Sequence, residues 1–90
     1  MRQVHLIVSG KVQNVWFRAE TKKKADSLGV VGWVKNLDSG EVEVYASGPE
    51  TKLKELVQWC HQGPPKARVV QVKVEWDINV GSFHTFEIVE

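Results

Sequence analysis

Hydrophobic and polar residues alternate at the start of the chain and then change to a helical period. Three apolar residues occupy one side of a two-residue repeat, the pattern of a strand with one buried face: Val4, Leu6 and Val8. Four later residues recur at i, i+4, i+8 and i+11, which is a stripe along a helix: Phe17, Thr21, Ala25 and Leu28. Gly29 is suited to end that helix. The chain is therefore expected to begin with a strand that leads into a helix over residues 17–28.

A hairpin and a second helix are predicted in the middle of the chain. Strands are expected over residues 30–37 and 42–47, and the turn residues Leu-Asp-Ser-Gly at 37–40 separate them. Gly48, Pro49 and Glu50 are typical of a helix start, and Gly63 with the two prolines after it indicates the helix end. The core stripe of this helix follows an i, i+3, i+4, i+7 spacing: Leu53, Leu56, Val57 and Cys60.

Two more strands complete the predicted fold. A short fifth strand is expected over residues 83–89, and a fourth strand presents one apolar face: Val70, Val72, Val74 and Trp76. The resulting order, β-α-β-β-α-β with a terminal strand, is the split βαβ motif of a ferredoxin-like α+β sandwich. We expect an antiparallel sheet with both helices on one face, in a single domain spanning residues 1–90.

The uncovered face of that sheet is expected to be polar enough to meet water. Six residues line it in the predicted alternation: Gln3, His5, Ser9, Glu41, Glu43 and Tyr45. A wet face offers no large apolar surface to a second copy, so the protein is expected to be a monomer.

The composition of the chain excludes several kinds of binding partner and indicates a cellular compartment. With 12 Lys and Arg against 11 Asp and Glu, the net charge is +1, so no overall field attracts nucleic acid or an anionic membrane. No apolar run approaches the ~18 residues of a membrane span, and the alternating start lacks the apolar core of a signal peptide. Cys60 is the only cysteine, which excludes a disulfide scaffold. A cytoplasmic protein without nucleic-acid or membrane partners is expected.

Several common chemistries find no support in the sequence. Cys60 lies on the core stripe of the second helix, so a buried, inert thiol is expected rather than a nucleophile. His5, His61 and His84 lie in three separate segments without metal-ligand spacing, so no metal site is expected. RNA-recognition motifs share this element order and stack bases on aromatic residues of the central strands. Here only Tyr45 offers such a ring, which makes RNA binding a weak alternative.

The segment between the first strand and the first helix is the candidate site. It runs Gly-Lys-Val-Gln-Asn-Val-Trp-Phe-Arg over residues 10–18. Gly10 and Asn14 tolerate backbone conformations that other residues resist, and N–H groups that point into such a curl can hold an anion. Arg18 lies at the positive end of the helix dipole, a conflict that a bound anion would remove. A plain connecting loop, with the arginine in solvent, fits these residues equally well.

Residues 10–18 resemble the acylphosphatase signature G-x-V-Q-G-V-x-F-R. Residues 32–43, Gly-Trp-Val-Lys-Asn-Leu-Asp-Ser-Gly-Glu-Val-Glu, resemble that family's second block. The similarity continues at residues 47–50, 59–60, 63–65 and 74–76, so it covers essentially the whole chain. The resemblance implies a ferredoxin-like fold, which is also the fold predicted from the strand and helix pattern.

The resemblance further implies an enzyme that hydrolyses acyl phosphates to a carboxylate and inorganic phosphate, without a metal or another cofactor. Arg18 matches the family's phosphate-binding arginine, and Asn36 matches the asparagine that positions the attacking water. Five loop residues would hold the phosphoryl oxygens through backbone N–H groups: Gln13, Asn14, Val15, Trp16 and Phe17. The partner is then a small acyl phosphate held at its phosphoryl and carbonyl ends, so broad acyl specificity is expected.

Asn14 departs from the family pattern, which has glycine at this point of the loop. If the position needs a positive φ, asparagine is the best substitute among the other residues. If the backbone passes very close to the phosphate, the added side chain crowds it. The alternative function is therefore an acylphosphatase-like domain that binds phosphate with little turnover.

Overall fold

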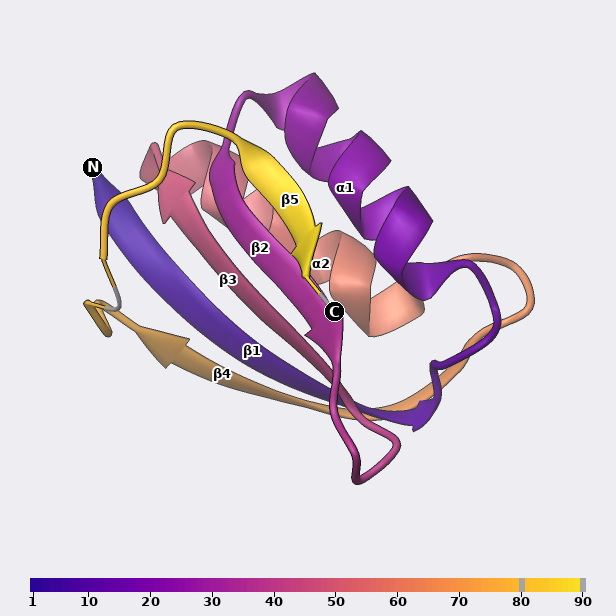
Figure 1. Cartoon of the computed structure of the whole chain (residues 1–90). Helices are drawn as coiled ribbons and strands as arrows, with labels where there is room; N and C mark the ends of the chain where they lie inside the picture. Colours follow the sequence, from indigo (N-terminus) through magenta and orange to yellow (C-terminus); the bar gives the residue numbers. More distant parts are fainter. Residues whose placement is uncertain (80, 90) are drawn as a thin grey trace.

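A computed structural model describes residues 1–79 and 81–89 and places two helices on one face of a sheet (Figure 1). The elements follow the predicted order: β1 (Arg2–Lys11), α1 (Phe17–Leu28), β2 (Val31–Asn36), β3 (Val42–Gly48), α2 (Glu50–Gln62), β4 (Arg68–Trp76) and β5 (Phe86–Val89). The predicted ferredoxin-like α+β arrangement is confirmed. Neither described helix is long and apolar enough to cross a membrane.

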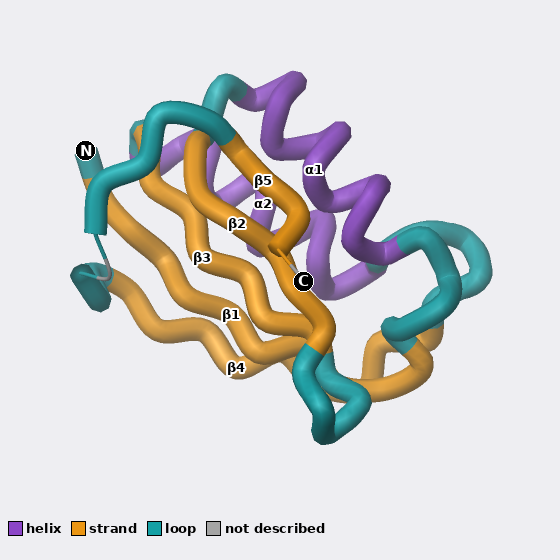
Figure 2. The backbone as a smooth tube through the Cα atoms, in the orientation of Figure 1, coloured by secondary structure: helices purple, strands orange, loops and turns teal. Residues whose placement is uncertain are grey.

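The sheet is mixed rather than wholly antiparallel. Its order is β4-β1-β3-β2-β5, and the first four of these strands pair antiparallel, as predicted. β5 pairs parallel with β2. The connection after β4 passes the end of the sheet where β2 starts, and β5 enters the far edge from there (Figure 2). Because β5 runs parallel to β2, both strands finish at the same end of the sheet.

The core lies between the sheet and the two helices. β1 contributes Val4, Leu6 and Val8 without exposed surface, as the alternation predicts. Each helix buries three residues of its predicted stripe: Phe17, Thr21 and Ala25 on α1, and Leu53, Leu56 and Cys60 on α2. Burial raises the pKa of the Cys60 thiol to about 12, so it stays protonated at neutral pH. The prediction of a buried thiol is confirmed.

One residue of β4 lies on the opposite face from the predicted one. Val70 is 75% exposed, whereas the later apolar residues of β4 pack against the core. The pairing of β1 with β4 shifts between Ser9 and Gly10, where Val70 is left without a partner. Val70 is thus the extra residue of a β-bulge, and Val69 takes the inward position instead. The prediction that Val70 faces the core is wrong, because the bulge reverses the alternation.

The face of the sheet away from the helices is less polar than predicted. Tyr45 is buried, because Trp33 stacks beside it at 6.0 Å between ring centroids and Phe83 lies at 5.5 Å. β5 begins at Phe86 rather than at residue 83, so Phe83 belongs to the segment that precedes the strand. The prediction that Tyr45 faces water is wrong, and its ring is covered where an RNA-recognition motif would expose one.

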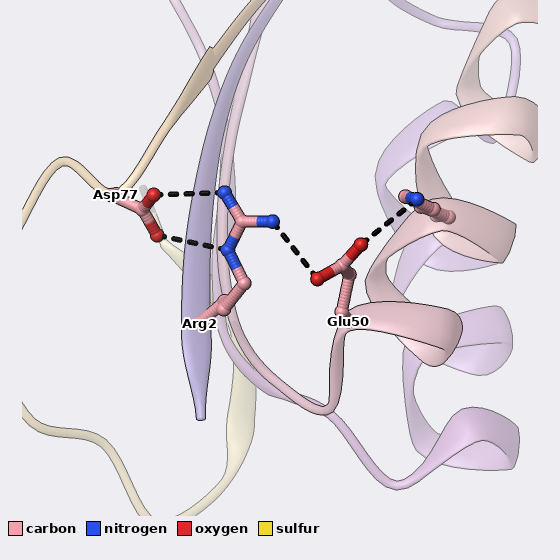
Figure 3. A network of polar contacts seen from close by, with 4 residues as sticks. Arg2, Glu50 and Asp77 are labelled. Atoms are coloured by element: carbon pink, nitrogen blue, oxygen red, sulfur yellow. Dashed lines mark hydrogen bonds and ion pairs between the residues drawn. The ribbon is translucent and has the colours of Figure 1, made fainter.

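An ion-pair network joins the start of β1 to α2 and to Asp77, the residue directly after β4 (Figure 3). The Arg2 guanidinium donates two hydrogen bonds to Asp77, of 3.2 and 2.8 Å, and lies 3.0 Å from Glu50. The same guanidinium stacks 4.7 Å from the Trp76 ring centroid. The hydrogen bonds from Arg2 lower the pKa of Asp77, and those from Lys54 and Arg2 lower the pKa of Glu50. The network is structural, since the candidate site lies beyond the other end of β1.

Candidate active site

The β-bulge lies near the end of β1, and the loop that follows this strand curls before it enters α1. Gly10 has a φ of 123°, and a Cβ there would lie 2.2 Å from the Arg68 carbonyl oxygen, so this position requires glycine. Asn14 and Trp16 have φ values of 62° and 69°, which lie in the left-handed region. The chain then enters α1 at Phe17.

The amide groups of this loop are available to a ligand. Within residues 1–79 and 81–89, the N–H groups of residues 13–17 donate to no other backbone or side-chain group. The first amides of α1 also lack intrahelical acceptors, as at every helix start, and the helix dipole adds positive potential there. These features make the curl suitable for an anion.

The side chain of Gln13 connects this loop to the β2–β3 hairpin. Its Nε2 donates to the carbonyl oxygens of Leu37 and Glu41, at 2.8 and 2.9 Å. Because both partners are acceptors, they also determine which end of the amide is the nitrogen. Leu37 follows directly after Asn36, so Gln13 holds the loop at the end of β2 that carries Asn36.

Replacing Gln13 by leucine is expected to lower the free energy of unfolding by about 1–2 kcal/mol. Both hydrogen bonds are lost, but the two carbonyl groups keep their hairpin partners, since Leu37 accepts from Gly40 and Glu41 accepts from Leu37. Urea denaturation measures the change. Gln58→Leu, at an exposed position of α2, is the matched control. Equal stability of the two variants would contradict the connecting role of Gln13.

A pocket of about 460 Å³ lies beside the loop. The loop and the first turn of α1 contribute most of its wall: Val12, Asn14, Trp16, Phe17, Arg18 and Ala19. Asn36 at the end of β2 and Ile88 of β5 complete it. The pocket therefore brings together Arg18 and Asn36, which lie in the two separate motifs of the sequence.

Arg18 is the second residue of α1 and is half-buried in the pocket wall. Among the described residues, no carboxylate lies within ion-pair distance of its guanidinium. A positive charge near the N-terminus of a helix is unfavourable unless an anion offsets it. The planar guanidinium can donate two parallel hydrogen bonds to one phosphoryl group.

Asn36 places a buried acceptor in the same pocket. Its Oδ1 is buried and has no hydrogen-bond partner among the described residues. The simpler interpretation of Asn36 is a side chain that caps the hairpin turn, but it donates no hydrogen bond to the described turn residues. Buried polar atoms are nearly always hydrogen-bonded, so an acceptor of this kind indicates a ligand or water position.

The other predicted loop residues contribute in different ways. The side chains of Asn14, Trp16 and Phe17 line the pocket. Gln13 turns to the hairpin and Val15 is buried, so these two residues can offer a ligand only their backbone. Sequence reasoning missed Ile88, because nothing in a short terminal strand indicates which distant loop it will face.

Replacing Asn14 by glycine is expected to leave activity unchanged or higher, with stability within about 1 kcal/mol of the native protein. Glycine adopts the observed φ of 62° without strain, whereas alanine there costs about 1–2 kcal/mol. Phosphate release and urea denaturation of Asn14→Gly and Asn14→Ala test this. A large loss of activity in Asn14→Gly would mean that the asparagine side chain has a specific role.

The sequence is similar to acylphosphatases over nearly its full length. The sequence profile of the acylphosphatase family matches residues 4–88. An acylphosphatase from Pelotomaculum thermopropionicum is 48% identical over 86 residues, which cover 96% of this chain and 94% of the relative. One from Methylococcus capsulatus is 43% identical, with 98% of this chain and 96% of the relative covered.

Solved acylphosphatase structures have the same fold. The crystal structure of acylphosphatase from Bacillus subtilis superposes with a TM-score of 0.95 at 39% identity, covering 100% of both chains. The structure of an acylphosphatase from Coxiella burnetii gives 0.91 at 42% identity, covering 97% of this chain and 90% of the other. The expected enzyme class is confirmed by these matches. The chain therefore belongs to the acylphosphatase family.

Proposed function

We propose that the chain hydrolyses acyl phosphates by in-line attack of a water molecule on a phosphoryl group held in this pocket. Acyl phosphate hydrolysis itself is supported by family membership. The observation that carries the mechanism is that Arg18 lies in one pocket with the buried Oδ1 of Asn36, which has no hydrogen-bond partner in the part of the chain that the structure describes.

The phosphoryl group is bound by charge and by oriented amides. The N–H groups of residues 13–17 donate to its equatorial oxygens, and the Arg18 guanidinium donates two further hydrogen bonds. Phosphoryl transfer depends mainly on positioning and on stabilising the charge on these oxygens. Preorganised donors of this kind usually supply the largest single share of catalysis.

The leaving group requires no acid. A carboxylic acid has a pKa of about 4, judged from aspartic and glutamic side chains, so the carboxylate departs unprotonated. The reaction breaks the bond between phosphorus and the acyl oxygen and forms one between phosphorus and the water oxygen. In this mechanism, neither the bond that breaks nor the bond that forms requires a metal ion or another cofactor.

Asn36 positions the attacking water. Its Oδ1 accepts a hydrogen bond from that water, and its Nδ2 can donate to a phosphoryl oxygen. An amide oxygen is too weak a base to take the proton, so the proton passes to the phosphate late in the reaction. Asn36 therefore acts through orientation.

The alternative, a phosphate-binding domain with little turnover, rests on Asn14. Asparagine adopts the observed φ of 62° at a modest cost, so the backbone conformation of the loop gives no support to the alternative. A monomeric, cytoplasmic protein in one domain, acting on small acyl phosphates and without nucleic-acid or membrane partners, remains our prediction from the sequence.

Release of phosphate from benzoyl phosphate in the presence of EDTA tests the proposal, alongside calorimetric titration with inorganic phosphate. Turnover in EDTA together with phosphate binding is the expected result. Phosphate binding without turnover would favour the alternative function. Absence of both would contradict the proposed site.

A further inference from the structure

We infer that Trp16 and Ile88 form an acyl subsite that selects apolar acyl groups, aromatic ones above all, over acetyl and charged ones. The inference rests on the proposed function and specifies its substrate class. It replaces the expectation of broad acyl specificity, since both side chains lie in the wall of the pocket that holds Arg18 and Asn36.

Trp16 is exposed without a structural reason. The residue is 71% exposed to solvent. Its indole contacts no aromatic ring, cation or hydrogen-bond partner among the described residues. The other tryptophans each pack against a partner: Trp33 against Tyr45, Trp59 against Phe17 and Trp76 against Arg2. Trp16 therefore leaves a large apolar face exposed in the lining of the pocket.

The backbone of Trp16 is also unusual. A bulky residue at a φ of 69° is an outlier, because the left-handed region suits glycine or asparagine. Strained residues of this kind occur preferentially at ligand sites, where the surrounding structure holds them in place. An exposed indole in a strained conformation is best explained by a ligand that uses it.

Ile88 supplies apolar surface from a different element. It is 39% exposed and lies on β5, paired with Val34, two residues before Asn36 on β2. It is thus placed near the proposed water site, with apolar surface open to the pocket.

The remaining pocket wall is mixed, with the uncharged polar residues Asn14 and Asn36 beside apolar ones. Val12, Phe17 and Ala19 line it, and Arg18 is the one charged side chain among its described lining residues. Because the phosphoryl group uses that guanidinium, an acyl group with its own charge finds no partner there. A volume of about 460 Å³ falls within the ~300–1,000 Å³ of small-molecule sites, which leaves room for an aromatic ring beyond the phosphate.

The ratio of kcat/KM for benzoyl phosphate to that for acetyl phosphate tests the subsite. Trp16→Gly removes the indole at a φ that glycine adopts freely, and we expect the ratio to fall about 5–10-fold, the size of one aromatic contact. Trp16→Phe should retain most of the ratio. Ile88→Ala should lower it about twofold, whereas Ile78→Ala, at an isoleucine 41% exposed outside the pocket, should leave it unchanged.

Binding of unreactive analogues separates this inference from the proposed function. We expect benzoylphosphonate to bind the native protein more tightly than acetylphosphonate in calorimetry, with the preference reduced in Trp16→Gly. If this pattern appears while neither acyl phosphate is hydrolysed, the proposed function fails and the subsite stands. The subsite is overturned if Trp16→Gly and Ile88→Ala both leave the benzoyl-to-acetyl ratio of kcat/KM unchanged. It is also overturned if the native protein binds the two analogues equally.

Discussion

Replacing Arg18 by alanine is expected to lower kcat/KM for acyl phosphate hydrolysis by about 1,000-fold. Arg18 is the one charged side chain among the described residues of the pocket wall, so its loss leaves only uncharged donors, the loop amides and the Asn36 amide, to stabilise the phosphoryl oxygens. Initial rates over a range of benzoyl phosphate concentrations measure the effect. Binding of inorganic phosphate should weaken together with the rate, because the proposed mechanism has the guanidinium contact both substrate and product.

The variant Arg18→Lys separates the effect of the positive charge from the effect of the planar guanidinium geometry. It keeps the positive charge but replaces a planar fork with a point charge, so KM should rise steeply while part of kcat survives. Arg68→Ala, at an exposed arginine of β4 that does not line the pocket, is the matched control and should leave the rate unchanged. Activity of Arg18→Ala within threefold of native would contradict the phosphate-binding role.

Replacing Asn36 by alanine is expected to lower kcat by about 100–1,000-fold, by analogy with the loss of one preorganised hydrogen-bonding group. Inorganic phosphate should still inhibit competitively with a similar constant, because Arg18 and the loop amides remain. The melting temperature should stay the same or rise, since the change removes a buried oxygen that has no partner among the described residues. Steady-state kinetics with phosphate inhibition and a thermal melt give all three values.

The combination of lost turnover and retained stability distinguishes a water-positioning residue from a structural one. A structural asparagine would lose stability and phosphate binding together. Asn79→Ala, at an exposed asparagine whose Oδ1 accepts from the Gly81 amide, is the matched control outside the pocket. Normal turnover of benzoyl phosphate by Asn36→Ala would show that the assigned role is wrong.

The two helices and β1 were predictable because burial alone determines their patterns. Phe17 and Ala25 fall on the inner side of α1, and Leu53 and Leu56 on that of α2, wherever the rest of the chain lies. Val70 was mispredicted because a bulge opposite β1 is a property of two paired strands rather than of one.

Contacts between distant segments explain why the burial of Tyr45 and the direction of β5 were not predicted. Tyr45 alternates as an outward residue of β3, but Phe83, which lies 38 positions later in the chain, covers it. The mixed sheet likewise depends on where the connection after β4 crosses, which local periodicity does not encode.

The candidate site was predictable only in part. Arg18 and Asn36 were predicted as site residues because each lies in a recognisable motif, and the structure places both in one pocket. The connection from Gln13 to Leu37 depends on a side chain that crosses between elements. Ile88 enters the pocket wall through the pairing of β5 with β2, so the sequence carried no signal for it.

A crystal structure with bound sulfate tests the central claim most directly, because sulfate has the shape and charge of the phosphoryl group. The predicted result is one sulfate within hydrogen-bond distance of the amides of residues 13–17 and of the Arg18 guanidinium, with an ordered water on Asn36 Oδ1. Sulfate absent from the curl, or an Arg18 side chain turned away from it with no water on Asn36, would contradict the account.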